Sequence, residues 1–378
     1  MRIAIEALGI EPTGGGRSAT RNLLESLFAI DSDNEYVLFV SQAEVFEPSP
    51  PNVKQVIAGR MPAWAQRLWA QAVIPFYTRH WGADLLHHVK NLTVVGAVCP
   101  VIVTVYDLTV LRFPQFYPWL DGWYWRHVQP RALRSADRII AISRTTASDL
   151  VHFYHIPAER IVVIYPSYNA RLLSCPVAPE AARERYSIKR EYILHVGSIS
   201  QKKNLLPLLR AYVRLRRAGI QIDLVLVGRR YQKGRDVALE SFLKEMDFAD
   251  GVIMTGPVPA HDLAALYRGA SVLVFPSLHE GFGIVPVEAM ACGVPVVSSP
   301  GGALGEVVGA GGWLLSDPGD EKEIAQAIEA ILCDDALRAD LVRRGYDRAK
   351  MFTPERAARQ TLDLYRAVTH RSPTRHGP

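Results

Sequence analysis

The chain has 378 residues, of which 49% are hydrophobic and 21% are charged, and it carries a formal net charge of +5. This length exceeds one ordinary domain and suits two, each with its own core, and the composition is that of a globular rather than a disordered or fibrous protein. The cysteines are scattered and form no C-x-x-C pair, which indicates reduced thiols and argues against a zinc site or a disulfide framework. They are Cys99, Cys175, Cys292 and Cys333.

The N-terminal residues, MRIAIEALGI, read as a first strand and lack the apolar region and the small-residue cleavage site of a signal peptide. No apolar run approaches the roughly 18 residues that a membrane-spanning helix needs. We therefore expect a cytoplasmic protein.

Short β-rich runs alternate with longer amphipathic runs, the pattern of α/β proteins with parallel sheets. The expected strands cover residues 3–7, 36–40, 55–58, 85–88, 101–106, 138–142 and 162–165, and then 192–196, 223–227, 252–255, 272–275, 294–297 and 313–315. A fresh strand begins near Tyr192 after a stretch punctuated by Pro and Arg, so we expect one domain over residues 1–180 and another over 186–352. Thr353 as N-cap and Pro354 as first residue predict a final helix over 353–370.

Gly14, Gly15 and Gly16 precede a helical run over residues 17–30. Their spacing fits neither the G-x-G-x-x-G pattern nor the P-loop pattern, which argues against a dinucleotide oxidoreductase and a P-loop ATPase. A plain turn accounts for three glycines as well as a phosphate-binding loop does.

The most informative run is SLHEGFGIVPVEAMACGVPVV, which places Glu280 and Glu288 eight residues apart. Glu280 follows a buried-looking strand, and open α/β sheets bind ligands on the loops at the carboxyl ends of their strands. Gly281 and Gly283 allow the backbone to approach a ligand closely, and the helix expected over residues 284–292 favours a phosphate at its N-terminus. Glu288 lies one turn into that helix, where a carboxylate suits neutral hydroxyl groups such as those of a ribose. The alternative is a strand–loop–helix with both acids on a solvated face.

This run resembles the Glu-x7-Glu motif of the retaining glycosyltransferases of family 4 (glycosyl transferases group 1), which have the GT-B fold. The flanking residues PSLHEGFG and EAMACGVPVV agree with the family as well as the two acids do. The resemblance covers nearly the whole chain and implies an α/β protein of two Rossmann-like domains that face each other across a cleft. The N-terminal domain would bind the acceptor, the C-terminal domain would bind a nucleotide sugar, and helix 353–370 would cross back to the N-terminal domain.

The resemblance also assigns donor contacts. Residues 196–205, VGSISQKKNL, resemble the family segment that brings basic residues to the donor's phosphates, and Lys203 aligns with its lysine. Lys202 takes the place of an arginine and gives up bidentate geometry for a point charge, while Ser198 stands where some relatives have a further arginine. The other expected donor contacts are Gly15, Gly16, Val258, Gly281, Phe282, Gly283, Ile284 and Glu288. The alternative for the lysines is that they solvate a helix start, where the helix dipole disfavours cations unless an anion binds.

Two further segments of the second half resemble parts of the family's site. Residues 255–258 and the helix expected after Asp262 resemble the loop that binds the base through its backbone. Residues 299–306, SPGGALGE, resemble the segment that closes the cleft, although their glycines fit an ordinary turn equally well.

In the first half, Tyr106 and Asp107 occupy the position where many relatives carry His-Asp. The missing histidine leaves Asp107 as a candidate catalytic residue and Tyr106 as a candidate contact on the acceptor side. His87 and His88 are the histidines that we place near the acceptor, although a satisfied structural role accounts for each as well.

Breaking a sugar–phosphate bond builds negative charge on the leaving nucleoside diphosphate, which preorganised cations and N–H dipoles stabilise. Lys203, Lys202 and the amides of residues 281–284 supply these, so we expect neither a metal nor another cofactor. The candidate catalytic residues are thus Glu280, Lys203 and Asp107. The resemblance treats Glu280 as a donor-sugar contact rather than a covalent nucleophile and implies a same-face internal return.

Residues 196–205 and 101–116 look most like bacterial mannosyl- and rhamnosyltransferases of polysaccharide assembly. We therefore expect a hexosyltransferase that uses a nucleotide sugar, with GDP-mannose as the first expectation. The expected acceptor is a saccharide or a polyprenyl-diphosphate-linked saccharide. Two alternatives stay open: a GT-B nucleotide-sugar epimerase or glycogen-synthase-like enzyme, and a catalytically silent sugar-nucleotide-binding scaffold at the membrane.

Aromatic and basic residues gather in two stretches of the first half. They are Arg60, Trp64, Arg67, Trp69, Phe76, Tyr77, Arg79 and Trp81, then Trp119, Trp123, Trp125, Arg126, Arg131 and Arg134. Trp and Tyr beside Arg is a composition found where an anionic membrane meets water, so we expect peripheral contact with the inner face of the cell membrane. Aromatic core residues with a basic rim are the alternative. No nucleic-acid-binding module is recognised, and we expect no such partner.

Overall fold

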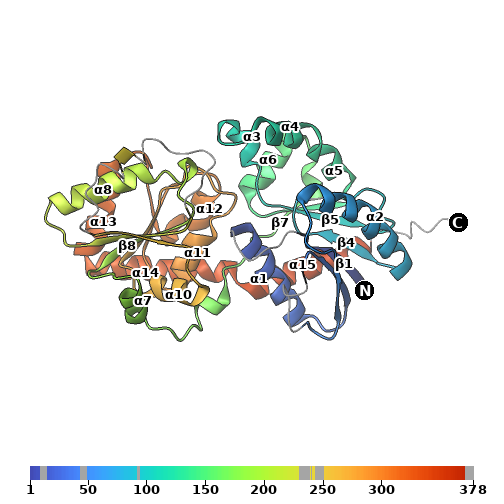
Figure 1. Ribbon diagram of the computed structural model, residues 1–378, viewed down its shortest axis with the longest axis horizontal. Helices are drawn as coiled ribbons and strands as arrows, with labels where there is room; N and C mark the ends of the chain where they lie inside the picture. The colour runs from blue at the N-terminus through green and yellow to red at the C-terminus, as the bar shows by residue number, and fades with distance from the viewer. Residues whose placement is uncertain are drawn as a thin grey trace. The chain divides into compact units, whose positions relative to one another are not determined.

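The structure, a computed structural model, describes residues 1–8, 15–42, 49–91, 94–229, 239, 241–242 and 251–370. The chain forms two compact units. The first comprises Met1–Ser167 together with the residues from Pro354 onward, and the second comprises Tyr168–Thr353. In each unit, helices cover the two faces of a parallel β-sheet (Figure 1).

The first unit contains a seven-stranded sheet in the order β3-β2-β1-β4-β5-β6-β7, and every neighbouring pair of strands is parallel. The strands are β1 (Arg2–Glu6), β2 (Glu35–Val40), β3 (Val53–Ile57), β4 (Leu85–His88), β5 (Val101–Val105), β6 (Arg138–Ala141) and β7 (Ile161–Val163). The helices are α1 (Gly15–Ile30), α2 (Ala63–Trp81), α3 (Thr109–Arg112), α4 (Trp119–His127), α5 (Gln129–Ser135), α6 (Arg144–Tyr154) and α15 (Pro354–Thr369).

The second unit repeats this plan with a six-stranded sheet in the order β10-β9-β8-β11-β12-β13, again parallel throughout. The strands are β8 (Tyr192–Val196), β9 (Asp223–Val227), β10 (Val252–Gly256), β11 (Val272–Phe275), β12 (Val296–Ser298) and β13 (Trp313–Leu314). The helices include α7 (Pro179–Arg185), α8 (Leu205–Arg217), α10 (Ala260–Arg268), α11 (Ile284–Ala291), α12 (Leu304–Val308), α13 (Glu321–Cys333) and α14 (Asp335–Ala349). Helix α8 packs beside α13, and α11 packs beside α14.

Both sheets have the Rossmann order, in which the chain adds strands on one side of its first strand and then on the other. Each expected strand is confirmed, with its ends moved by at most two residues. The sequence locates them well because strands such as β5, β8, β9 and β11 are buried at every position. Parallel strands covered on both faces read as unbroken apolar runs.

The C-terminal helix packs on the first unit, as the resemblance implies. Ala358, Leu362 and Tyr365 of α15 share a core cluster with Leu24 and Leu27 of α1. Tyr365 is fully buried, and its hydroxyl forms a 2.6 Å hydrogen bond with Nδ1 of His87 on β4. The helix therefore contributes a polar contact to the centre of the first sheet as well as apolar area.

The boundary between the units lies earlier than expected. We expected the first domain to reach residue 180 and the second to begin at 186, but the units divide between Ser167 and Tyr168. Helix α7 fills the expected linker and packs against α10 within the second unit.

Arg268 of α10 explains why the Pro-punctuated stretch is not a free linker. Its guanidinium donates to the carbonyl groups of Leu172, Cys175 and Val177 at 3.1, 3.1 and 2.5 Å. Helix α10 also begins at Ala260, before Asp262 rather than after it. The buried Asp262 carboxylate accepts hydrogen bonds from Arg185 and Tyr186 at 2.5 and 2.7 Å, which joins α7 to α10.

The cysteines are free thiols, as their spacing predicts, and Cys99 is buried. Among the described residues, no helix combines the length and the apolar character that crossing a membrane requires.

The Tyr365–His87 contact generates a stability prediction. Replacing Tyr365 with Phe leaves a buried imidazole nitrogen without its partner, so it should lower the free energy of unfolding by about 1–3 kcal/mol. Arg359→Gln, at an exposed position of the same helix, is the matched control and should change it little. Urea unfolding monitored by circular dichroism measures both variants, and equal stabilities would contradict the structural role given to this contact.

Candidate functional site

The second sheet has its switch point between β8 and β11, because β9 pairs with one edge of β8 and β11 with the other. Open α/β sheets bind ligands at the carboxyl ends of the strands at such a point. The loop after β8 carries Lys202 and Lys203, and the loop after β11 carries Glu280. The topology thus brings together two segments that are 77 residues apart in the sequence.

Hydrogen bonds between backbone and side chains tie these two loops together. The carbonyl group of Lys202 accepts from the backbone N–H of Leu278 at 2.9 Å and from the hydroxyl of Ser277 at 3.2 Å. Asn204, in a left-handed conformation with φ of 52°, donates to the carbonyl of Pro276 at 3.3 Å. The position of each loop therefore depends on the other.

Glu280 contacts both lysines. The Nζ atom of Lys203 lies 2.5 Å from Oε1 of Glu280, and the Nζ atom of Lys202 lies 3.7 Å from Oε2. The hydroxyl of Ser277 donates to the same Oε1 at 2.5 Å. The side chains of Glu280 and Lys203 are each 14% exposed, so a ligand can reach the cluster although it is largely shielded from water.

This environment keeps Glu280 ionised. Burial by itself would raise the pKa of Glu280, but the positive charges of Lys203 and Lys202 and the hydrogen bonds from Lys203 and Ser277 outweigh it and lower the pKa to about 2. The site therefore presents one carboxylate and two ammonium groups at neutral pH.

The glycines of residues 299–306 allow a close backbone contact with Glu280. A Cβ atom on Gly302, whose φ is 65°, would lie 2.4 Å from the carbonyl oxygen of Glu280. The N–H of Ala303 donates to that same carbonyl at 2.8 Å. These glycines are thus more than an ordinary turn, because they allow this segment to hold the backbone of Glu280.

Residues 281–284 form the turn from Glu280 into α11. Gly283 is the N-cap of the helix with φ of 103°, a conformation that favours glycine, and a Cβ atom there would lie 2.5 Å from the side chain of Leu304. Phe282 is buried, and its ring packs edge-on against Phe352 with centroids 5.3 Å apart. The turn fixes the N-terminus of α11, whose free N–H groups attract an anion.

Glu288 lies on α11 in a different environment. Its side chain is buried and its Oε2 accepts a 3.1 Å hydrogen bond from the hydroxyl of Tyr267, which is also buried. Burial raises the pKa of Glu288 to about 7, and the hydrogen bonds from Tyr267 and the backbone of Asn169 offset it only in part. The two acids of the motif thus differ: one is paired with cations, and the other is held by neutral donors.

Tyr106 and Asp107 follow β5 in the first unit. The Tyr106 hydroxyl forms a hydrogen bond with Oγ1 of Thr20 on α1, and burial raises the pKa of Tyr106 to about 12. Oδ1 of Asp107 accepts from the backbone N–H of Thr109 at 2.9 Å, which fixes the start of α3. Each side chain therefore has a local structural contact at the carboxyl end of a strand.

His87 and His88 are fully buried on β4. Nδ1 of His87 contacts Tyr365, and its Nε2 lies 2.8 Å from Oγ1 of Thr104. Burial lowers the pKa of His87 to about 3, so the ring is neutral. His88 accepts from the N–H of Val94 at 3.3 Å through Nε2, which leaves Nδ1 to face Oε2 of Glu6 at 3.4 Å. These contacts give both histidines a structural role.

The remaining expected donor contacts are Gly15, Gly16 and Val258. Gly15 and Gly16 are the first residues of α1 rather than part of a free loop, and Gly14 lies outside the described residues. Val258 lies between β10 and α10 and is partly exposed.

His195, on β8 beneath Lys203, is a polar residue that the sequence did not single out. It is fully buried, and its Nδ1 donates to the carbonyl of Val274 at 3.0 Å. Burial lowers the pKa of His195 to about 4, and its Nε2 has no hydrogen-bond partner among the described residues. The signal was a histidine inside an apolar strand, two residues before Gly197, the glycine that opens the lysine loop.

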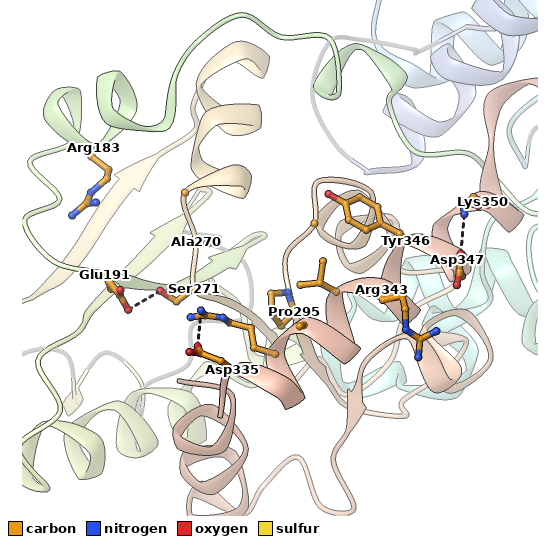
Figure 2. A pocket seen from close by; sticks show the side chains of 15 residues that line it. Arg183, Glu191, Ala270, Ser271, Pro295, Asp335, Arg343, Tyr346, Asp347 and Lys350 are labelled. Atoms are coloured by element: carbon orange, nitrogen blue, oxygen red, sulfur yellow. Dashed lines mark hydrogen bonds and ion pairs between the residues drawn. The ribbon is translucent and has the colours of Figure 1, made fainter. Parts of the chain in front are cut away.

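A pocket of about 1000 Å³ opens at the opposite end of the strands of the second sheet, where their first residues lie (Figure 2). The segments that precede β8, β11 and β12 line it together with α14. None of the candidate site residues lines this pocket. Its cations have local partners, since Arg338 pairs with Asp335 and Lys350 with Asp347, each at 2.8 Å. The candidate site is placed at the opposite end of the strands, where the switch point lies.

Sequence comparison places both units in known families. The family described as "Glycosyltransferase Family 4" matches residues 13–172, and the one described as "Glycosyl transferases group 1" matches residues 180–348. O-antigen chain mannosyltransferase B of Escherichia coli is 30% identical over 288 residues, which cover 75% of this chain and 75% of that protein. D-inositol 3-phosphate glycosyltransferase of Paenarthrobacter aurescens is 30% identical over 243 residues, which cover 63% of this chain and 59% of that protein.

Structural comparison agrees with the fold. Sucrose-phosphate synthase from Thermosynechococcus elongatus superposes with a TM-score of 0.78 at 23% identity, over 98% of this chain and 100% of that chain. At this level of identity, the likeness shows that the two chains share the GT-B fold and nothing further about substrates.

The raised pKa of Glu288 predicts a pH dependence of stability. Between the ordinary glutamate value of 4.5 and about 7, the folded protein binds more protons at this site than the unfolded chain, so stability should fall as pH rises through this range. Glu288→Gln removes the titration and should be more stable than the wild type by up to about 3 kcal/mol at pH 8. Thermal melts from pH 5 to 8 measure this. Glu329→Gln, at an exposed position, should keep the wild-type slope, and a Glu288→Gln variant that also kept it would contradict the assignment.

Proposed function

Because the chain belongs to the family-4 glycosyltransferases (glycosyl transferases group 1), we propose that it is a retaining hexosyltransferase that needs no metal and moves mannose from GDP-mannose to a saccharide or a polyprenyl-diphosphate-linked saccharide. The observation that supports this most directly is the cluster of Lys202, Lys203 and Glu280 at the switch point of the second sheet. Two ammonium groups next to a helix N-terminus suit a diphosphate, whose negative charges they would stabilise.

In the proposed reaction, the bond between the sugar C1 and the phosphate oxygen breaks, and a bond from C1 to an acceptor oxygen forms on the same face. The acceptor proton passes to the leaving phosphate oxygen, so no separate base is needed. Lys203, Lys202 and the N–H groups at the start of α11 stabilise the charge that develops on the leaving nucleoside diphosphate. Glu280 contacts the donor sugar, and Glu288 accepts from the ribose hydroxyl groups.

The choice of donor and pathway rests on similarity. The Escherichia coli relative carries a name that refers to mannose transfer in O-antigen assembly, which supports mannose and polysaccharide biosynthesis. The Paenarthrobacter relative carries a name that refers to D-inositol 3-phosphate, which keeps a small phosphorylated acceptor as the second candidate.

Removing the Lys203 ammonium tests the site. Lys203→Met should lower kcat/KM for transfer from the preferred nucleotide sugar by about 10²–10³-fold, the effect of losing one charge-stabilising contact. Lys322→Met, on the exposed face of α13, is the matched control and should retain wild-type transfer.

The donor is identified first by thermal-shift screening with GDP, UDP, ADP and dTDP sugars, because a ligand at about a hundred times its Kd adds about 2.7 kcal/mol to stability. Product analysis then separates the alternatives: an epimerase needs no acceptor, and a silent scaffold releases and transfers no sugar. Equal transfer by Lys203→Met and wild type would contradict the proposed site.

A membrane-facing surface on the first unit would bring the enzyme to a lipid-linked acceptor. We define the aromatic surface as the exposed side chains of Trp64, Leu68, Trp119, Leu120 and Trp123, on α2 and α4. Trp64 is 68% exposed and Trp119 is 76% exposed. The guanidinium of Arg67 on α2 lies over the ring of Tyr124 on α4, 4.7 Å from its centroid, which joins the two helices. Exposed Trp with neighbouring Arg suits an anionic interface.

The aromatic residues of the two stretches form two groups, one that packs in the core and one that is exposed. Trp69, Tyr77, Trp81 and Trp125 pack against the apolar core of the first unit. The five residues of the aromatic surface do not, and they are the ones that we propose to contact lipid.

Vesicle flotation tests this docking. The wild type should float at low salt with vesicles that contain phosphatidylglycerol and stay behind with neutral vesicles, because each Arg near an anionic surface contributes about 1 kcal/mol. Trp119→Ser with Trp123→Ser should abolish flotation, whereas Leu173→Ser, an exposed leucine of the second unit, should not. Wild-type protein that fails to float at low salt would end the docking proposal and leave the transferase proposal intact.

A further inference from the structure

Glu280 is held by the groups that are proposed to bind the donor's diphosphate. Both of its oxygens are engaged, Oε1 by Lys203 and Ser277 and Oε2 by Lys202. The contact with Lys203 is short, at 2.5 Å between Nζ and Oε1. The site itself therefore contains an anion in contact with both ammonium groups.

The surrounding structure keeps this arrangement in place. The ammonium group of Lys203 lies 4.7 Å from the centroid of the Phe275 ring, a favourable contact between a cation and an aromatic face. The backbone of Lys202 is bonded to Leu278 and Ser277, and the backbone of Glu280 is bonded to Ala303. These contacts hold the backbone of Lys202 and of Glu280 and favour the position of the Lys203 ammonium group, so an incoming phosphate meets the lysines next to Glu280.

The charges of the cluster make Glu280 and a diphosphate competitors. A carboxylate within contact distance of an ammonium group partly neutralises it, and it repels a phosphate that approaches the same group. The side chains of Lys203 and Glu280 are mostly shielded from solvent, so salt and water screen this repulsion less than they would at the surface. The low pKa of Glu280, about 2, means that protonation does not relieve it at working pH.

We propose that Glu280 is a counter-anion that belongs to the phosphate site. It holds Lys203 and Lys202 in position when no donor is bound, and it lowers the affinity of the site for a diphosphate. This role rests on the proposed function, since it assumes that the lysines bind the donor's phosphates. It adds a second function to Glu280 besides its contact with the sugar: it favours release of the nucleoside diphosphate product after transfer. A transferase gains from this because product release limits turnover in many enzymes.

Removal of the negative charge should therefore strengthen the binding of diphosphates while it impairs transfer. We expect Glu280→Gln to bind inorganic pyrophosphate, and whichever of GDP, UDP, ADP and dTDP binds the wild type, about tenfold more tightly, which corresponds to about 1.4 kcal/mol. Isothermal titration calorimetry measures the dissociation constants. Inorganic pyrophosphate is included because its binding does not depend on the base or the ribose.

Two controls separate this effect from a general change in charge. Glu329→Gln is the same substitution at an exposed position of α13, and it should leave the affinity for pyrophosphate unchanged. In a Lys203→Met background, Glu280→Gln should improve pyrophosphate binding by much less than tenfold. In that background the Lys203 ammonium group is absent, so Glu280 and the phosphate no longer compete for it.

Loss of the carboxylate leaves two ammonium groups close together, so stability is checked by thermal melts. Glu280→Gln should melt below the wild type without ligand and gain more than the wild type from added pyrophosphate. Should Glu280→Gln not fold, Glu280→Ala replaces it with the same expectation.

The outcomes distinguish this inference from the proposed function. Wild-type protein that binds neither pyrophosphate nor any of the nucleotides overturns the proposed function. Wild-type protein that binds them, with Glu280→Gln binding equally or more weakly, overturns the counter-anion role alone.

Discussion

The contact between Lys203 and Glu280 is the interaction on which the candidate site depends. It joins the loops that leave β8 and β11, and its two charges are largely shielded from water. A buried charge is costly unless it is paired, and removing one partner leaves the other uncompensated. The cluster of Lys202, Lys203 and Glu280 therefore joins the two loops, together with the hydrogen bonds of the Lys202 carbonyl and of Asn204, and it provides the positive charges that a diphosphate would meet.

Backbone packing makes that contact possible. Gly302 lies against the backbone of Glu280 so closely that a Cβ atom would clash, and Gly283 turns the chain into α11 in a conformation that favours glycine. Next to Gly283, the buried ring of Phe282 packs against Phe352. The glycines thus place the Glu280 carboxylate and the N-terminus of α11 at the carboxyl ends of the strands.

In the first unit, burial decides which role a residue of a given type has. His87 and His88 lie at the end of a strand, where a catalytic histidine would also lie, yet their ring nitrogens are occupied by Tyr365, Thr104, Val94 and Glu6. The tryptophans divide in the same way: Trp69 and Trp125 pack against the core, whereas Trp64 and Trp119 are exposed. The residue type is the same in both groups, and only the position on the helix decides whether the tryptophan is buried or exposed.

The sequence by itself determined the strands, the two-sheet α/β plan and the motif of Glu280 and Glu288, because buried parallel strands are continuous apolar runs and the motif lies within one strand–loop–helix. Only the tertiary structure decided the pairing of Glu280 with Lys203 and the different environments of the two acids. It also decided the burial of the His195 ring and the boundary between the two units after Ser167. Each of these depends on contacts between residues far apart in the chain: charge pairing and burial are properties of neighbours in space, which a local pattern does not contain.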